Sequence, residues 1–249
     1  MRIAVCMYGQ PRTWKKCVDW IQESYDLEGS TIDYFCNVKN YNTEKATGVK
    51  TKISDAEIDQ LLLDYSPKKH FVEQIDGFNG HGGFSSTMLS IVNSINLKQM
   101  YEQEKGILYD LCILQRYDCL TGPEQDWLYR FIVDTNPKTM AIYITKDFIH
   151  FGQDCFKAGI TDLLIMGHNT AMDALAANLI NNFCPGSTME KIVDAHLYTP
   201  HVMLRDACMQ NNIRIIEYAI DSLLIREDSN LEGGILQNWR ELSDFWKPK

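Results

Sequence analysis

The strongest constraint on the fold of this chain is a regular alternation of short apolar runs with amphipathic helical segments. The first run, residues 3–7, is continuously apolar and is followed by Gly9 and Pro11, a pattern typical of a buried parallel strand that stops at a turn. From about Thr13, apolar residues recur at spacings of three and four, which predicts a helix directly after this strand. A strand followed by a helix is the repeating unit of sheets whose strands run parallel.

The same alternation continues to about residue 226 and predicts the remaining elements. Ser54 and Glu57 form a capping box that opens a helix, Pro67 ends that helix, and Gly106 ends a long helix that begins near residues 85–87. Strands are also expected at residues 32–36, 69–74, 109–115, 140–144, 163–166 and 213–218, helices at 171–180 and 200–209, and a loop at 37–52. We therefore expect one α/β domain over residues 1–226, with a mainly parallel sheet covered by helices on both faces, and a C-terminal extension at 227–249.

Composition excludes several classes of protein. Of the 249 residues, 45% are hydrophobic and 23% are charged, which is the balance of a globular protein, and no apolar run approaches membrane-spanning length. The formal net charge of −9 argues against a nucleic-acid partner, because binding to phosphates along a strand needs clustered Lys and Arg. The first apolar run is too short for a signal peptide core, and the eight cysteines form no C-x-x-C pair. We therefore expect a cytoplasmic protein with reduced, core-filling cysteines and no transmembrane segment.

The residues that follow each strand are the candidates for a binding site, since ligands of such sheets bind beyond the carboxyl ends of the strands. Arg116 and Asp118 follow the predicted strand at 109–115. A carboxylate at this position can hold a hard divalent cation against a diphosphate, or it can form a purely structural ion pair with Arg116. Gly9 to Arg12 follow the first strand and form either a tight turn with a solvated Arg12 or part of the ligand site.

Other candidates carry weaker signals. The loop at residues 77–83 is rich in glycine and precedes a helix, where backbone amides can bind an anion, but it lacks the lysine of a P-loop and fits a surface loop better. Ser85 and Ser86 are better interpreted as helix caps than as ligands. His168, His196 and His201 are candidates for a second metal ligand, although a lone histidine is more often structural.

Several short motifs, taken in their order and spacing, resemble a known family. They are Gly9-Gln10-Pro11-Arg12, the pattern from Ser86 through Leu97-Lys98 to Tyr101-Glu102, Tyr109-Asp110 followed by Leu114-Gln-Arg116-Tyr-Asp118, and Asp162-Leu-Leu-Ile-Met-Gly167. In these motifs the chain is similar to GT-A-like glycosyltransferases of viruses, phages and bacterial polysaccharide loci. The resemblance spans residues 1–226 and implies a Rossmann-like sheet and the transfer of a sugar from a nucleotide-diphosphate donor to a glycan or other small acceptor.

The resemblance also implies roles for individual residues. In such enzymes an Asp-x-Asp motif, or a reduced version of it, holds Mn²⁺ or Mg²⁺ against the diphosphate, and Arg116-Tyr117-Asp118 takes its place here, so Asp118 is the expected metal ligand. Because Arg116 replaces the first aspartate, it can itself neutralise the diphosphate, and metal-independent transfer stays open. Asp162 is expected near the acceptor as the catalytic base, although a helix cap or loop aspartate would have the same local sequence. The residues expected to bind the nucleotide sugar are Gly9, Gln10, Pro11, Arg12, Ser86, Arg116, Tyr117 and Asp118.

Two other functions remain as alternatives. The incomplete Asp-x-Asp pattern is compatible with a nucleotide-sugar-binding protein that has no catalytic activity. A nucleotidyltransferase is less consistent with the sequence, because it needs a basic, glycine-rich loop after the first strand, where this chain has only Gly9 and Arg12.

Overall fold

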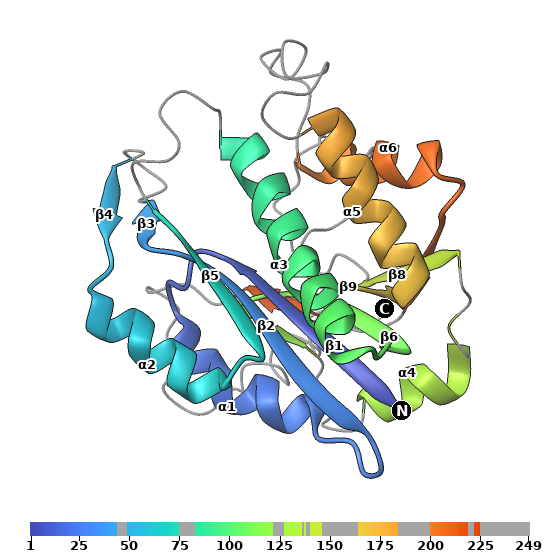
Figure 1. Cartoon of the computed structure of the whole chain (residues 1–249), viewed down its shortest axis with the longest axis horizontal. Helices are drawn as coiled ribbons and strands as arrows, with labels where there is room; N and C mark the ends of the chain where they lie inside the picture. The colour runs from blue at the N-terminus through green and yellow to red at the C-terminus, as the bar shows by residue number, and fades with distance from the viewer. Residues whose placement is uncertain are drawn as a thin grey trace, which may run out of the picture.

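A seven-stranded sheet forms the centre of the part of the chain that the structure, a computed structural model, describes (Figure 1). The described residues are 1–43, 49–74, 83–121, 127–135, 137, 140–145, 164–183, 200–218 and 222–224. The strands lie in the order β10-β8-β9-β6-β1-β2-β5. Their bounds are β1 Arg2–Gly9, β2 Thr31–Lys39, β5 Lys69–Glu73, β6 Leu111–Arg116, β8 Ala141–Thr145, β9 Leu164–His168 and β10 Arg214–Tyr218.

The sheet is mainly parallel, as the sequence predicts. Strands β5, β2, β1 and β6 are parallel neighbours, and β8 pairs in parallel with β10. Strand β9 is the exception, because it runs antiparallel to both β6 and β8. Apolar periodicity is the same in either direction along a strand, so it did not reveal this reversal.

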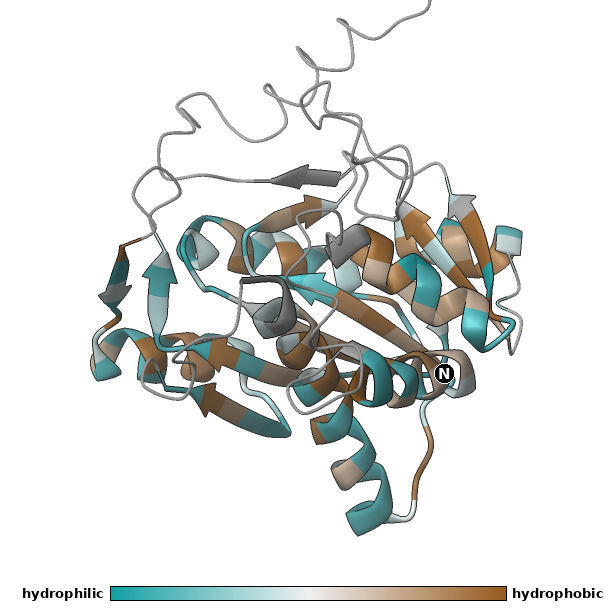
Figure 2. Cartoon of the chain, turned by 90° about the horizontal axis from the view of Figure 1, so that it is seen from above, coloured by the Kyte–Doolittle hydropathy of each residue, from teal (hydrophilic) through white to brown (hydrophobic). Residues whose placement is uncertain are grey.

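Helices cover both faces of the sheet (Figure 1). In β1, Ala4 and Cys6 belong to one hydrophobic cluster and Ile3 and Val5 to another, so the continuous apolar run predicted from the sequence supplies both faces. The central strands are accordingly coloured as hydrophobic in Figure 2. One face is covered by α3 Gly83–Lys105, α5 Asn169–Phe183 and α6 Pro200–Gln210, and the other by α1 Trp14–Tyr25, α2 Asp55–Tyr65 and α4 Trp127–Thr135.

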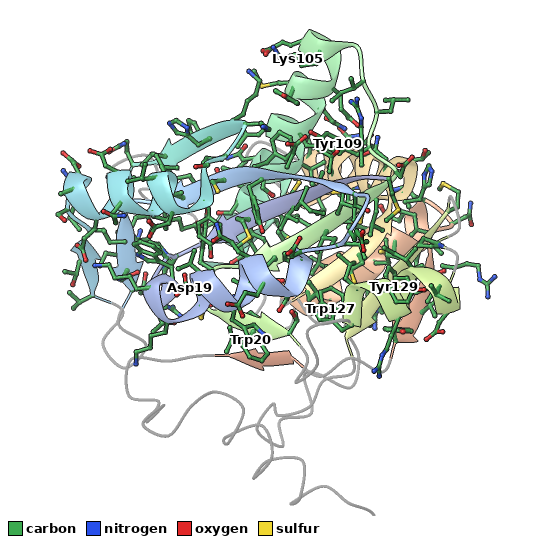
Figure 3. All side chains as sticks on the ribbon, turned by 90° about the horizontal axis from the view of Figure 1, so that it is seen from below. Asp19, Trp20, Lys105, Tyr109, Trp127 and Tyr129 are labelled. Carbon is green, nitrogen blue, oxygen red and sulfur yellow. The ribbon has the colours of Figure 1, made fainter. Side chains whose placement is uncertain are left out.

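Two tryptophans fix the helices on the α1 side (Figure 3). The indole Nε1 of Trp20 donates a hydrogen bond of 3.1 Å to the carbonyl oxygen of Thr121. Trp127, the first residue of α4, packs edge-on against Tyr25 of α1 with ring centroids 5.5 Å apart. These contacts hold α1 against the segment that follows β6, where the candidate site lies.

The helix predictions are largely confirmed. Helix α2 begins after Ser54, whose side chain accepts a hydrogen bond from the backbone N–H of Glu57, as expected of a capping box. Helix α3 already begins at Gly83, so the expectation that Ser85 and Ser86 cap it is wrong, and both lie within the helix.

The predicted loop at residues 37–52 is wrong at both ends. Strand β2 continues to Lys39, and two short antiparallel strands follow, β3 Tyr41–Thr43 and β4 Lys50–Lys52. A second small pair joins β7 Cys119–Thr121 to β11 Ser222–Leu224. These strands could not be predicted from the sequence, because three residues are too few to show an alternating pattern.

Lys98 and Glu102 of α3 form an i,i+4 ion pair that is buried. Lys98 is 0% exposed, and its Nζ lies 3.1 Å from Glu102 Oε2 and 2.7 Å from Asp173 Oδ1 of α5. Lys98 also donates to the side-chain oxygen of Asn169. This cluster joins α3 to α5 on one face of the sheet.

The described cysteines fill the core, as predicted. Six of them are free and buried: Cys6, Cys17, Cys36, Cys112, Cys119 and Cys208. Cys155 and Cys184 lie outside the described residues, as does the expected extension at 227–249. Among the described residues, no helix is both long enough and apolar enough to cross a membrane.

Candidate binding site at the carboxyl edge of the sheet

The strand order creates a topological switch point between β1 and β6. From β1 the chain moves outward to β2 and β5, and then returns to the other side of β1 as β6. Ligands of open α/β sheets bind at such a point, beyond the carboxyl ends of the two strands. The register pairs Tyr8 with Arg116, so Gly9 to Arg12 and Arg116 to Asp118 both follow strands that end at this place.

The turn after β1 has an unusual backbone. Gly9 has a φ of 99° and Arg12 a φ of 30°, so two residues out of four adopt positive φ. A non-glycine residue in this region is strained, and such strain is found mainly where the surrounding structure, often a functional site, imposes it. Pro11 is buried, and its carbonyl oxygen accepts a 2.7 Å hydrogen bond from the N–H of Trp14, which closes the turn into α1.

The side chain of Gln10 ties this turn to β3. Its Oε1 accepts from the Nε of Arg12 at 2.9 Å and from the backbone N–H of Thr43 at 3.1 Å, and its Nε2 donates to Thr43 Oγ1 at 2.7 Å. Asn42 Oδ1 also accepts from the backbone N–H of Arg12 at 3.2 Å. The expected role of Gln10 in reading a base stays a prediction, and in this structure its amide positions Arg12.

Asp118 lies between two guanidinium groups. Its Oδ1 accepts from Arg116 Nε and its Oδ2 from Arg116 Nη2, both at 2.9 Å, and Arg12 Nη1 lies 3.5 Å from Oδ2. The side chain of Asp118 is 1% exposed, whereas those of Arg12 and Arg116 are 22% and 21% exposed. The carboxylate is therefore concealed behind the two cations, which form the accessible side of this cluster.

A third cation, Lys39, lies buried at the end of β2. Its Nζ donates to Ser86 Oγ at 2.5 Å and lies 3.9 Å from Glu73 Oε2, which is also buried. Burial lowers the pKa of Lys39 to about 8; Glu73 opposes this effect, while Lys50, Arg116 and Arg12 reinforce it.

The described side chains do not fit a divalent metal at Asp118. Both of its oxygens already accept N–H groups from arginine, and no cluster of three His, Cys, Asp or Glu side chains within the described ranges could hold a metal ion. At an effective dielectric constant of about 20, a divalent ion roughly 4 Å from a guanidinium is repelled by about 8 kcal/mol. Arg116 stands where a second carboxylate would offset this repulsion, and Arg12 adds to the repulsion. The metal at Asp118 therefore stays a prediction from the family resemblance, without support from the donor set.

Several other predicted site residues lie elsewhere or have another role. Tyr117 is 0% exposed and packs against Tyr65 with ring centroids 5.8 Å apart, so its side chain belongs to the core. Ser86 is 5% exposed and contacts the site through Lys39. His168 ends the antiparallel strand β9 opposite Leu111, the first residue of β6, so the structure does not bring it to Asp118, and its role as a second metal ligand stays a prediction.

Three candidate side chains cannot be placed. Asp162 and His196 lie outside the described residues, as does most of the glycine loop at 77–83, and the side chain of His201 in α6 is not described. Three charged residues near the site, Lys39, Lys50 and Glu73, are not predicted from the sequence. The signal for Lys39 and Glu73 was their position as the last residues of β2 and β5, which pair in register. It was hidden because residues 37–52 were assigned to a loop.

Comparisons with known proteins show little similarity beyond the arrangement of elements. No family model matches the chain, and no curated protein matches it either. One solved structure with a similar arrangement is that of a glycosyltransferase involved in the glycosylation of the major capsid of PBCV-1. The two are 9% identical with a TM-score of 0.43, over 88% of this chain and 81% of the other. Because both the sequence identity and the TM-score are this low, the likeness carries no argument about function.

Proposed function

We propose that this chain is a glycosyltransferase that takes a sugar from a nucleotide-diphosphate donor, with the diphosphate at the switch point between β1 and β6. One observation carries the proposal: Arg12 and Arg116, from two segments about 100 residues apart in the sequence, both bind Asp118 there. Guanidinium groups suit phosphate oxygens, because their planar N–H forks donate in pairs. A strand-order reversal and a pair of arginines are together the features expected of a site for a phosphorylated ligand.

The charge distribution supports an anionic ligand at this edge. The chain as a whole carries a formal charge of −9, yet three cationic side chains, Arg12, Lys39 and Arg116, gather where β1, β2 and β6 end. Grouping cations in an acidic protein costs electrostatic free energy unless a ligand or local carboxylates compensate. Together with the motif resemblance, this favours a nucleotide diphosphate over a neutral ligand.

The proposed reaction uses these residues to stabilise the leaving group. The bond between the anomeric carbon and the diphosphate oxygen breaks, and its electron pair stays on the diphosphate. The positive charges of Arg12 and Arg116 stabilise the charge that develops on the diphosphate in the transition state. The acceptor hydroxyl oxygen forms the new bond to the anomeric carbon and gives its proton to a carboxylate base, which in this proposal is Asp162. Strand β9, which follows Asp162, begins at Leu164 opposite Gln115 of β6, at the same edge of the sheet.

A screen of nucleotide sugars tests the proposal. A donor present at 100 times its Kd should stabilise the folded chain by about 2.7 kcal/mol, which is readily measured as a rise in melting temperature. The stabilising donor should then be hydrolysed slowly, or transferred when glycan acceptors are added. Stabilisation without hydrolysis or transfer would instead favour a binding protein without activity, the alternative raised by the incomplete Asp-x-Asp motif. If no nucleotide sugar stabilised the chain, the proposal would be wrong.

A further inference from the structure

We propose that the protein neutralises the diphosphate with its own cations instead of a divalent metal, and that Asp118 is the positioning residue that holds Arg12 and Arg116 in place for this task. The inference rests on the proposed function, since it specifies how that same site holds its ligand. It differs from the expectation of a metal at Asp118, which the donor set does not support.

The local charges favour an anion over a cation. Arg12 and Arg116 share Asp118 at the carboxyl edge of the sheet, and both contribute, with Lys50 of β4, to lowering the pKa of Lys39 at the end of β2. Among the described residues the carboxylates that contact these cations are Asp118 and Glu73. The described contacts at this edge thus involve more cations than carboxylates, which favours an anionic ligand over a metal ion.

The position of Asp118 suits a role in holding the arginines. It lies two residues after Arg116 and binds that guanidinium through both carboxylate oxygens, while Arg12 approaches the same Oδ2. A single buried carboxylate thereby fixes the separation of two guanidiniums, one from the turn after β1 and one from the end of β6. Because Asp118 is 1% exposed and the arginines are 21–22% exposed, an arriving ligand meets the cations first.

Two features of the turn after β1 fix the position of the Arg12 side chain. Its φ of 30° is strained for a residue with a side chain, and a glycine there would avoid the strain. In addition, Gln10 accepts the Nε–H of Arg12 and is itself anchored on Thr43 of β3. A strained backbone and a hydrogen-bonded side chain of this kind are expected where the position of the guanidinium matters for binding a ligand.

Lys39 gives the site a dependence on pH. Its ammonium group is packed among Ser86 of α3, Glu73 of β5 and the ring of Tyr41 of β3, whose centroid is 5.9 Å from Nζ. The other charged groups that act on it are Lys50 of β4, Arg116 of β6 and Arg12. Since the pKa of Lys39 is lowered to about 8, its positive charge is present at pH 7 and is lost as the pH rises through 8.

Calorimetric titration of the full chain with uridine diphosphate, guanosine diphosphate and inorganic pyrophosphate tests the inference. The Kd of each probe should agree within about threefold between buffer with EDTA and buffer with Mn²⁺. In EDTA, Arg116→Met should weaken binding at least tenfold, and so should Arg12→Met. Arg2→Met is the matched control, because it removes the same charge from an exposed residue at the opposite end of β1 and should leave the Kd unchanged.

The outcomes separate the inference from the proposed function. Binding and donor hydrolysis that both require Mn²⁺ would overturn the inference and leave the proposed function in place. Metal-independent binding that is unchanged in both arginine variants would also overturn the inference, because the diphosphate would then lie elsewhere. If none of the three probes bound under either condition, the inference and the proposed function would both be wrong.

The pH dependence supplies a second readout, which a merely structural role would not affect. In EDTA, the affinity for the better-binding nucleoside diphosphate should fall several-fold between pH 7 and pH 9, because Lys39 loses its charge in this range. The ligand contributes little to this fall, since the second ionisation of its phosphate lies near pH 6. Lys39→Met should bind more weakly at pH 7 and show no such fall, whereas Lys39→Arg, which keeps its charge, should bind well across the range. A pH profile identical to wild type in Lys39→Arg would overturn the role of Lys39, even if Lys39→Met failed to fold.

Discussion

Replacing Asp118 by asparagine distinguishes a carboxylate that holds arginines from one that holds a metal. The substitution keeps the size of the side chain, removes its charge and turns one acceptor oxygen into an N–H₂ donor. In the structure both oxygens accept from Arg116 at 2.9 Å, so one of these hydrogen bonds becomes a contact between two donors. The other changes from a bond between charged groups to a bond with a neutral acceptor.

The expected loss of stability follows from these contacts. A hydrogen bond between charged groups contributes about 1.5–3 kcal/mol and one between neutral groups about 0.5–1.5 kcal/mol. Loss of one bond and weakening of the other would reach several kcal/mol in a fully buried pair, but Arg12 and Arg116 are 22% and 21% exposed and regain some hydration. We therefore expect Asp118→Asn to lower the free energy of unfolding by about 2–3 kcal/mol. For a chain of this size, this corresponds to a fall in melting temperature of about 5–10 °C.

Calorimetric melting in EDTA, without nucleotide, measures this effect. Asp19→Asn is a suitable control, because Asp19 is an exposed aspartate on α1 (Figure 3) and its neutralisation should change stability by less than about 0.5 kcal/mol. The double variant with Arg116→Met should lose less than the sum of the two single losses, because the residues are in contact. A carboxylate reserved for a metal would behave in the opposite way, since removing an uncompensated buried charge stabilises the apo form. An unchanged or higher melting temperature for Asp118→Asn would therefore refute the role of Asp118 proposed here.

Three further substitutions test separate parts of the structure, each by chemical denaturation. Arg12→Gly should be more stable than Arg12→Met by about 1 kcal/mol, because both lose the guanidinium and only glycine relaxes the positive φ; equal stabilities would show that the backbone there is unstrained. Lys98→Met should cost about 3–5 kcal/mol, since it leaves the carboxylates of Glu102 and Asp173 without their buried cation; a loss below 1 kcal/mol would contradict the buried cluster. Ser54→Ala should cost about 1 kcal/mol through loss of the cap of α2, and Ser54→Gly a smaller amount.

The elements most accurately predicted from the sequence are those in which the pattern of apolar residues follows the buried faces. The run at residues 3–7 became the centre of β1, with alternate residues in the two hydrophobic clusters, because a strand covered on both faces has no polar side. The direction of β9 could not be predicted in this way. Strand direction depends on the path that the chain takes between strands, and a hydrophobic pattern contains no information about that path.

The candidate site was predicted in part, for a geometric reason. Gly9 to Arg12 and Arg116 to Asp118 were expected together because parallel strands end at the same edge, and β1 and β6 are indeed neighbours. The cation Lys39 was missed because a charged residue at 5% exposure contradicts the usual distribution of polar residues. Its burial becomes understandable only with Glu73, which arrives from a strand more than 30 residues later in the chain.

The order Arg116-Tyr117-Asp118 acquires a different meaning once its side chains are placed. Strand β6 ends at Arg116, and Tyr117 and Asp118 form the turn that follows it. Tyr117 packs into the core against Tyr65, while the side chains of Arg116 and Asp118 contact each other at the edge of the sheet. Two aspartates in these places would repel each other and attract a divalent cation, whereas here both oxygens of Asp118 accept hydrogen bonds from Arg116. Arg12, in the turn after β1, brings a second guanidinium to the same carboxylate, so the two arginines carry one positive charge more than Asp118 balances.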